Sequence, residues 1–194
     1  NGGDVTTKDD NYNQTSFSPK FGIVYQPIID KVSVFANYMD GFSNVAPGQN
    51  RNAGIVTPLT FNPEHANQFE VGTKLNLFKD KLYATLSYYD IKVTDKVYVI
   101  ETPYVDPTDP SAVLPNNQVS HQDGGQRNKG FEAELIANPI RGLNILLGYS
   151  YNDAVLTAGD PDFVGFRPES AGPQNLANLW ATYKFSQGFL RGLG

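Results

Sequence analysis

Residues 126–153, QRNKGFEAELIANPIRGLNILLGYSYND, decide the fold of this chain. Apolar side chains take every second position on both sides of a central turn over Asn138–Gly142. They are Phe131, Ala133, Leu135 and Ala137 before the turn, and Leu143, Ile145, Leu147, Tyr149 and Tyr151 after it. A period of two predicts β-strands, and a tilted strand of ~9–11 residues can cross a bilayer, whereas most soluble strands have ~5–6. The stretch therefore predicts a hairpin of two long strands.

Five more strands with the same alternation are predicted in the rest of the chain. Their ranges are 17–25, 32–40, 66–78, a strand beginning at residue 82, and 175–185. In the strand from residue 82, the apolar positions change from even numbers up to Tyr88 to odd numbers from Ile91 onward. This change of phase predicts a β-bulge near Tyr89 and Asp90. With the hairpin, these segments predict an all-β chain of about seven long antiparallel strands.

The connections between the predicted strands alternate strictly between short and long. The short ones are 26–31, 79–81 and 139–142; the long ones are 41–63, 101–125 and 156–173; residues 1–16 are a further polar loop. Antiparallel strands would gather all the long connections at one end, as bacterial outer-membrane barrels do with short periplasmic turns and long extracellular loops. Aromatic girdles of such barrels would explain the aromatic residues near strand ends: Tyr25, Tyr38, Phe78, Tyr151 and Phe185. A soluble β-sandwich also alternates, so alternation alone leaves that alternative open.

The composition excludes several other classes of protein. The chain contains no Cys, and it has no run of ~18 apolar residues that would predict a membrane-spanning helix. A net charge of −5 disfavours nucleic acid as a partner. The two histidines, His65 and His121, lie in or beside loops without metal-ligand spacing, and no phosphate-binding loop or nucleophile elbow occurs. We therefore expect no enzyme, no catalytic residue and no metal site.

Several short motifs resemble those of the TonB-dependent siderophore receptors. They are SPKFG at 18–22, PEHANQFEVGTK at 63–74, LYATLSYYDI at 82–91, NKGFEAE at 128–134, GYSY at 148–151 and LWATY at 179–183. Each motif is loose, but their order and spacing together are specific. The resemblance implies an antiparallel transmembrane β-barrel of 22 strands in the bacterial outer membrane, with an N-terminal plug domain inside. It implies uptake of a ferric siderophore with energy from the TonB complex.

The resemblance also implies what this sequence contributes. Residues 1–194 are expected to be part of a single barrel domain, without the plug domain, the TonB-contacting segment or the final strands, so we expect a piece of a longer chain. The implied partners are a ferric siderophore, outer-membrane lipid and lipopolysaccharide, the chain's own plug domain, and the TonB complex, with no nucleic acid. No covalently bound cofactor is expected, and the ferric siderophore is the transported ligand.

Two sets of residues are candidates for function. If the ligand is caught by the extracellular loops and the barrel wall, the candidate contacts are Tyr104, His121, Phe163, Phe166, Arg167 and Trp180. Loop packing or contact with lipopolysaccharide is the competing role for each. The face opposite the apolar one is expected to line the lumen or meet the plug through Lys20, Glu70, Lys74, Glu132, Glu134 and Lys184.

The charge of the long connections bears on the ligand. The second and third carry an excess of acidic residues over the single Arg167: Glu101, Asp106, Asp109, Asp123, Asp160, Asp162 and Glu169. An acidic mouth disfavours a strongly anionic ferric catecholate and favours a near-neutral ferric hydroxamate. The alternatives are a TonB-dependent transporter of another cargo such as cobalamin or an oligosaccharide, a passive porin-like barrel, and a soluble β-domain for adhesion or sugar binding.

Overall fold

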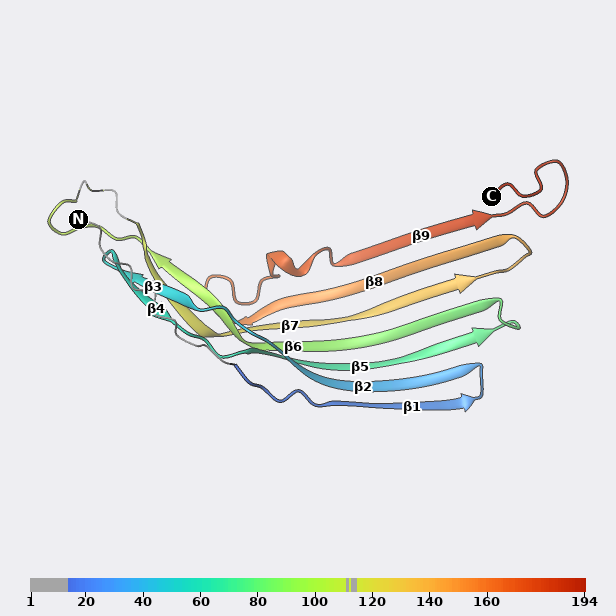
Figure 1. Ribbon diagram of the computed structural model, residues 1–194, viewed down its shortest axis with the longest axis horizontal. Helices are drawn as coiled ribbons and strands as arrows, with labels where there is room; N and C mark the ends of the chain where they lie inside the picture. The colour runs from blue at the N-terminus through green and yellow to red at the C-terminus, as the bar shows by residue number, and fades with distance from the viewer. Residues whose placement is uncertain (1–13, 111, 113–114) are drawn as a thin grey trace, which may run out of the picture.

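A computed structural model describes residues 14–110, 112 and 115–194, which form one antiparallel sheet (Figure 1). Its strands are β1 Lys20–Ile28, β2 Val32–Ser43, β3 Gly48–Asn52, β4 Ile55–Leu59, β5 Glu64–Leu77, β6 Leu82–Thr102, β7 Asn117–Ala137, β8 Leu143–Ala158 and β9 Asn175–Tyr183. A single 3-10 turn, η1 Glu169–Ala171, precedes β9. The long strands pair in the order β1-β2-β5-β6-β7-β8-β9, which confirms the predicted seven-stranded antiparallel sheet.

The hairpin at residues 126–153 forms as predicted, and the loop lengths segregate. Leu135 pairs with Leu147 and Phe131 with Tyr151 across β7 and β8. The three short turns lie at one end of the sheet, on the right in Figure 1, and the long connections lie at the other. No helix in the described part of the chain is long and apolar enough to cross a membrane.

The two faces of the sheet differ in chemistry. One face is hollowed by recesses whose lining includes Glu70, Glu132 and Asn152, so this face is the concave one. The opposite, convex face exposes large apolar side chains such as Leu86 and Phe131, which are 47% and 45% exposed. Within the described residues, Ala154 is the only hydrophobic side chain in the buried class. The sheet is therefore a single layer, unlike a soluble sandwich, whose second sheet covers the apolar face.

Several predicted boundaries are wrong at the long-loop end. The loop predicted at 101–125 is shorter than expected and spans only 103–116, because β6 continues to Thr102 and β7 already begins at Asn117. The loop predicted at 41–63 contains the β3–β4 hairpin, which pairs with the tip of β7 through Arg51 and Gln118. Polar segments become strands here because neighbouring strands satisfy their backbone groups, a tertiary effect that alternation does not report.

Other boundaries shift by a few residues. β1 begins at Lys20 rather than at residue 17 and runs to Ile28, so the first turn is shorter than predicted. In that turn Asp30 adopts a left-handed conformation with φ 60°. Residues 14–16 are not in a strand, in agreement with the predicted loop, and the rest of that loop, 1–13, lies outside the described residues.

The predicted bulge in β6 is misplaced. Pairing with β5 and β7 runs without a break from Leu82 to Val93, and the irregularity comes later, around Asp95, whose φ is 59°. Asp90 therefore continues the convex face. The side chains keep alternating between the two faces at Asp90. Only the chemistry of the convex face changes there, from apolar to polar.

Candidate functional site

The long-loop end of the sheet, here called the rim, is closed by the β3–β4 hairpin. Asn117 Oδ1 on β7 accepts a hydrogen bond from the Ala53 N–H at 2.8 Å, and Asn50 Oδ1 on β3 accepts one from the Ser120 N–H at 2.7 Å. Gln122 exchanges two hydrogen bonds with the backbone of Asn62, at 2.9 and 2.5 Å. The connection between β2 and β5 is thus tied to the tip of β7 by side chains that complete its backbone hydrogen bonds.

The bulge at Asp95 redirects the outer part of β6. Beyond it, the Lys96 ammonium donates a 2.7 Å hydrogen bond to Gln126 Oε1 on β7. Gln126 is only 9% exposed and donates in turn to Asn128 Oδ1 at 3.0 Å. A left-handed Asp costs ~1 kcal/mol or more, which is tolerated where a special geometry is held by its surroundings. The result is a cation placed among amides on the concave side of the rim.

Beside Lys96 lies an aromatic recess of about 200 Å³, mostly apolar in lining. Its walls are Tyr98, Leu156, Phe163 and the backbone of the β7 glycines, with Asp160 at one side. A Cβ on Gly124 would lie 2.7 Å from the Lys96 carbonyl oxygen and 3.2 Å from the Tyr98 ring, so a larger residue would fill the recess. The recess can accept a flat or apolar group next to a cation and a carboxylate.

Tyr98 also connects this recess to His121. The two rings are stacked, with centroids 5.2 Å apart and an interplanar angle of 15°. Partial burial, the hydrogen bond with Asp123 and the nearby carboxylates raise the pKa of the Tyr98 phenol above its ordinary value. The phenol therefore stays protonated over the physiological pH range and keeps its hydrogen bond to Asp123.

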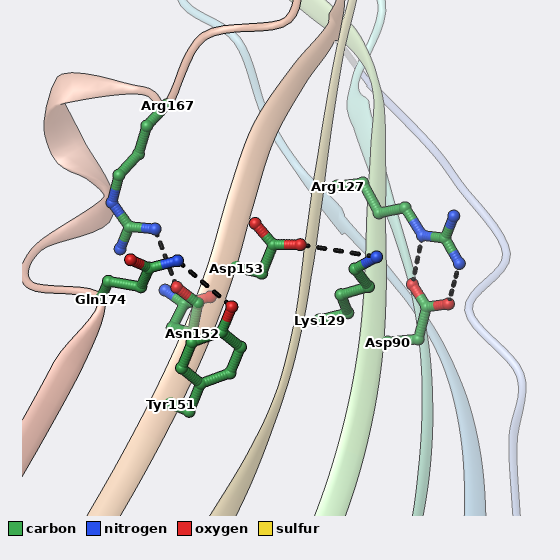
Figure 2. A network of polar contacts seen from close by, with 8 residues as sticks. All are labelled: Asp90, Arg127, Lys129, Tyr151, Asn152, Asp153, Arg167 and Gln174. Carbon is green, nitrogen blue, oxygen red and sulfur yellow. Dashed lines mark hydrogen bonds and ion pairs between the residues drawn. The ribbon is translucent and has the colours of Figure 1, made fainter.

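Arg167 fastens the third long connection. Its guanidinium donates to the carbonyl oxygens of Asn152 at 2.8 Å and Gly172 at 2.9 Å, and to that of Ala171 at 3.4 Å. Gln174 adds a 3.2 Å hydrogen bond to the Tyr151 hydroxyl (Figure 2). The hydrogen bonds of Arg167 use most of the donors of its guanidinium, so this side chain holds the loop in place beside β8.

A larger recess of about 550 Å³ lies on the concave face over β5, β6, β7 and β8. Its lining includes the carboxylates Glu70 and Glu132, the Tyr89 ring, and the amides of Gln68 and Asn128. All the lining side chains are acidic or uncharged. A second domain that carries cationic side chains could therefore pair with both carboxylates and amide oxygens on this surface.

The predicted ligand contacts are only partly brought together. His121 and Phe163 meet at the aromatic recess through Tyr98, and Phe166 lies close by in sequence, 65% exposed. Trp180 is far from them, because it pairs with Leu146 in the half of β9 nearer the short turns. Tyr104 lies in the connection after β6, partly buried.

Most of the residues predicted to line the lumen or meet the plug lie on the concave face, and that role stays a prediction. Glu70 and Glu132 line the large recess, Glu134 lines a neighbouring one, and Lys74 lies 5.7 Å from the centre of the Phe35 ring. Lys20 and Lys184 are exposed at the two sides of the sheet. Lys96, Tyr98 and Gln126 were missed, since the only signal for them in the sequence is the turn-like Thr94-Asp95 inside an otherwise regular strand.

Comparison with known proteins places this geometry in context. A family model described as TonB dependent receptor-like, beta-barrel, matches residues 1–194. The metal-pseudopaline receptor CntO of Pseudomonas aeruginosa is 27% identical over 92% of this chain and 22% of its own length. The ferric-pyoverdine M114 receptor PbuA of Pseudomonas sp. is 25% identical over 95% of this chain and 20% of its own length.

Solved structures of siderophore receptors are also similar to this chain. The crystal structure of BauA, the ferric preacinetobactin receptor from Acinetobacter baumannii, is similar with a TM-score of 0.62 and 26% identity. The match covers 90% of this chain and 24% of that one. The chain spans about a fifth of the length of the curated relatives it matches.

Proposed function

We propose that this chain, which belongs to the TonB-dependent receptor-like β-barrel family, is part of the wall of a receptor that takes up a ferric siderophore with energy from the TonB complex. The family is one of receptors and transporters of the bacterial outer membrane. The observation that carries the proposal is the curled single layer, apolar on its convex face and polar on its concave face. Such a layer suits lipid on one side and a wet lumen on the other.

Residues 1–194 act in this proposal as one segment of a barrel domain. Outer-membrane lipid covers the convex face, and the rim with its long connections faces outward. Seven long strands leave β1 and β9 as open edges, which the neighbouring strands of a complete barrel would pair. The relatives named above are receptors for metal-loaded or ferric small molecules, which supports a ferric siderophore as cargo.

The rim is the proposed site of ligand contact. Tyr98, His121 and Phe163 offer aromatic faces, and Lys96 offers a cation beside them. Tyr104, Phe166 and Trp180 remain predicted contacts, and Arg167 acts by positioning the loop that carries Phe163. The acidic residues of the long connections outnumber the basic ones, so we propose a near-neutral ferric hydroxamate in preference to a triply anionic catecholate.

The large concave recess is the proposed docking surface for the plug domain. Glu70 and Glu132 present carboxylates there that would pair with basic side chains of the plug, and Glu134, Lys74, Lys20 and Lys184 are the further lumenal contacts. Replacing Glu70 and Glu132 together by Gln is expected to increase hydrogen exchange of the plug in the full-length receptor. The matched replacement Glu101→Gln at the rim should leave plug exchange unchanged, and equal exchange in both variants would contradict the assignment.

The proposed activity is tested by iron uptake in cells that carry the full-length receptor. Iron-starved cells are given a ⁵⁵Fe-loaded hydroxamate or a ⁵⁵Fe-loaded catecholate, with TonB present or deleted. We expect TonB-dependent accumulation of the hydroxamate. Uptake that persists without TonB would favour a passive barrel, and TonB-dependent uptake of cobalamin or an oligosaccharide instead of iron would favour another cargo.

A further inference from the structure

The connections at the short-turn end of the sheet are rich in cations. There are three short turns and a segment that follows β9: residues 29–31, 78–81, 138–142 and 185–194. We call their five cationic side chains the basic turn surface: Lys31, Lys79, Lys81, Arg141 and Arg191. Only Asp30 and Asp80 oppose them, so this end carries a charge of +3 in a chain whose net charge is −5.

The cations of the basic turn surface are not used within the fold. All five are exposed, and within the described part of the chain none of them forms an ion pair. The Asp80 carboxylate, by contrast, is already engaged, because it accepts a 2.6 Å hydrogen bond from Asn76 Nδ2. The cations are therefore available to carboxylates of another molecule.

Backbone hydrogen bonds join neighbouring turns into one rigid surface. The Asn76 N–H donates to the Lys31 carbonyl oxygen at 2.7 Å, which ties the first turn to the second. The Asn138 N–H donates to the Lys81 carbonyl oxygen at 2.8 Å, which ties the second turn to the third. Strands lie ~4.8 Å apart, so successive hairpin turns follow one another at about 10 Å. The basic turn surface is therefore an extended row of cations at fixed intervals.

The second turn has an unusual backbone. Phe78, Lys79 and Asp80 are all left-handed, with φ 55°, 57° and 64°. Residues other than glycine rarely adopt this conformation, and it is found most often where a binding site holds it. A recess of about 510 Å³ lies between this turn and Lys31, and its lining includes Asn76, whose Oδ1 is buried without a hydrogen-bond partner among the described residues. The recess thus combines two cations with an unused acceptor.

The surface lies on the lumenal side of the turns. The hydrogen bonds of Lys31 and Lys81 keep both residues in register with the neighbouring strands, so side chains still alternate there. Lys81 is six residues from Ser87, which lines the concave recess, and so it shares the concave face. Lys31 is four residues from Phe35, whose ring the concave Lys74 approaches. Lipid on the convex face therefore does not meet these two cations.

The spacing of the side chains favours a polymer as the partner. The large apolar side chains exposed on the three short turns stand one to a turn, between the cations: Ile29, Phe78 and Ile140. A protein partner would need a contiguous apolar centre, which singly exposed side chains do not form. A row of separate cations instead suits an extended molecule with repeated carboxylates.

We propose that the basic turn surface binds the carboxylate-bearing peptide stems of peptidoglycan and so holds the receptor against the cell wall. The proposal rests on the orientation given under the proposed function, which turns this end toward the periplasm. Lys79, Lys81 and Arg141 pair with carboxylates of successive stems, and one stem enters the recess beside Lys31. Each exposed ion pair is weak, so binding depends on several of them acting together.

The test measures how much purified full-length receptor, taken as folded barrel, sediments with purified cell-wall sacculi. One variant removes three cations of the surface, K79Q/K81Q/R141Q. The charge-matched control removes three cations of the long-loop half, R51Q/K92Q/K129Q. A second batch of sacculi has its carboxylates converted to amides. We expect the unchanged receptor and the control to bind native sacculi only, and K79Q/K81Q/R141Q to bind them about ten- to a hundredfold more weakly.

Amine-reactive labelling of the full-length receptor, read by mass spectrometry, checks that the plug leaves Lys79 and Lys81 accessible. Protection of both lysines would overturn the proposal, as would equal binding of native and amidated sacculi or equal binding by the two triple variants. Binding to phosphatidylglycerol vesicles or to an acidic protein, with none to sacculi, would assign the surface to another partner and overturn it as well. Loss of siderophore uptake with sacculus binding intact would count against the proposed function alone.

Discussion

A charge placed on the convex face at mid-height should destabilise the barrel strongly. Leu86 lies four residues above the turn end of β6, so it stands about 10 Å into an apolar band of about 25 Å, close to the bilayer midplane. It pairs with Thr73 and Ala133, which share its face, and is 47% exposed. Leu86→Arg should therefore cost ~2–4 kcal/mol, roughly a 30- to 900-fold change in the folding equilibrium.

The neighbouring residue provides the matched control. Ser87 lies on the concave face, where it lines the recess that contains Glu70 and Glu132. Ser87→Arg should change stability little, because its charge faces water and carboxylates. Leu86→Ala measures the loss of apolar surface alone.

The assay is urea-dependent folding of the full-length receptor into phospholipid vesicles, followed by its heat-modifiable mobility in gels. If Leu86→Arg is no less stable than Ser87→Arg, the assignment of the convex face to lipid is wrong. If both variants are strongly destabilised, the concave face is also dry, and the wet lumen is excluded.

Three further outcomes are expected. Gly130→Ala should destabilise the receptor by about 1–3 kcal/mol in the same assay, because a Cβ there would clash with the Tyr151 carbonyl oxygen. Gly41→Ala, with its nearest atom at 3.9 Å, should cost much less, and equal costs would refute the contact. Arg167→Lys should raise hydrogen exchange of the backbone over residues 159–174 as much as Arg167→Gln does. The reason is that one ammonium cannot replace a guanidinium that donates to three carbonyl oxygens. Full protection of these residues in Arg167→Lys would show that charge alone holds the loop. Asp95→Gly should keep normal stability and ligand affinity, whereas Asp95→Val should lower the stability of the receptor by ~1–2 kcal/mol, because valine is strained at the left-handed φ of this position. Normal stability of Asp95→Val would mean that the bulge can relax.

The alternating part of the sheet could be predicted from the sequence, because lipid and water impose opposite chemistry on successive side chains. The hairpin of β7 and β8 follows that rule from Gly130 to Tyr151, and its turn is marked by Pro139 and Gly142. Outside the membrane both faces of a strand can meet water, and the rule no longer applies. The tip of β7 is a strand because β3 and β6 pair with it, as the bond between Asn50 and Ser120 illustrates.

The site was predicted less completely, for a related reason. His121 and Phe163 could be singled out as aromatic residues in long connections, but the Tyr98 ring that links them lay inside a predicted strand. The pairing of Asp90 with Arg127 joins positions 37 residues apart, and it follows only from the register. A misplaced bulge at Asp90 conceals this pair, because it assigns the residues beyond it to the wrong face.

The orientation of the long connections underlies the proposed function, and cysteine labelling measures it directly. The 194 residues contain no Cys, so single cysteines can be placed at Asp162 in the third long connection and at Lys81 in the second short turn of a full-length receptor that otherwise lacks cysteine. Both positions are exposed. A membrane-impermeant maleimide applied to intact cells should label Asp162→Cys at once and Lys81→Cys only after the outer membrane is permeabilised. Labelling of Lys81→Cys in intact cells, with Asp162→Cys protected, would contradict the account.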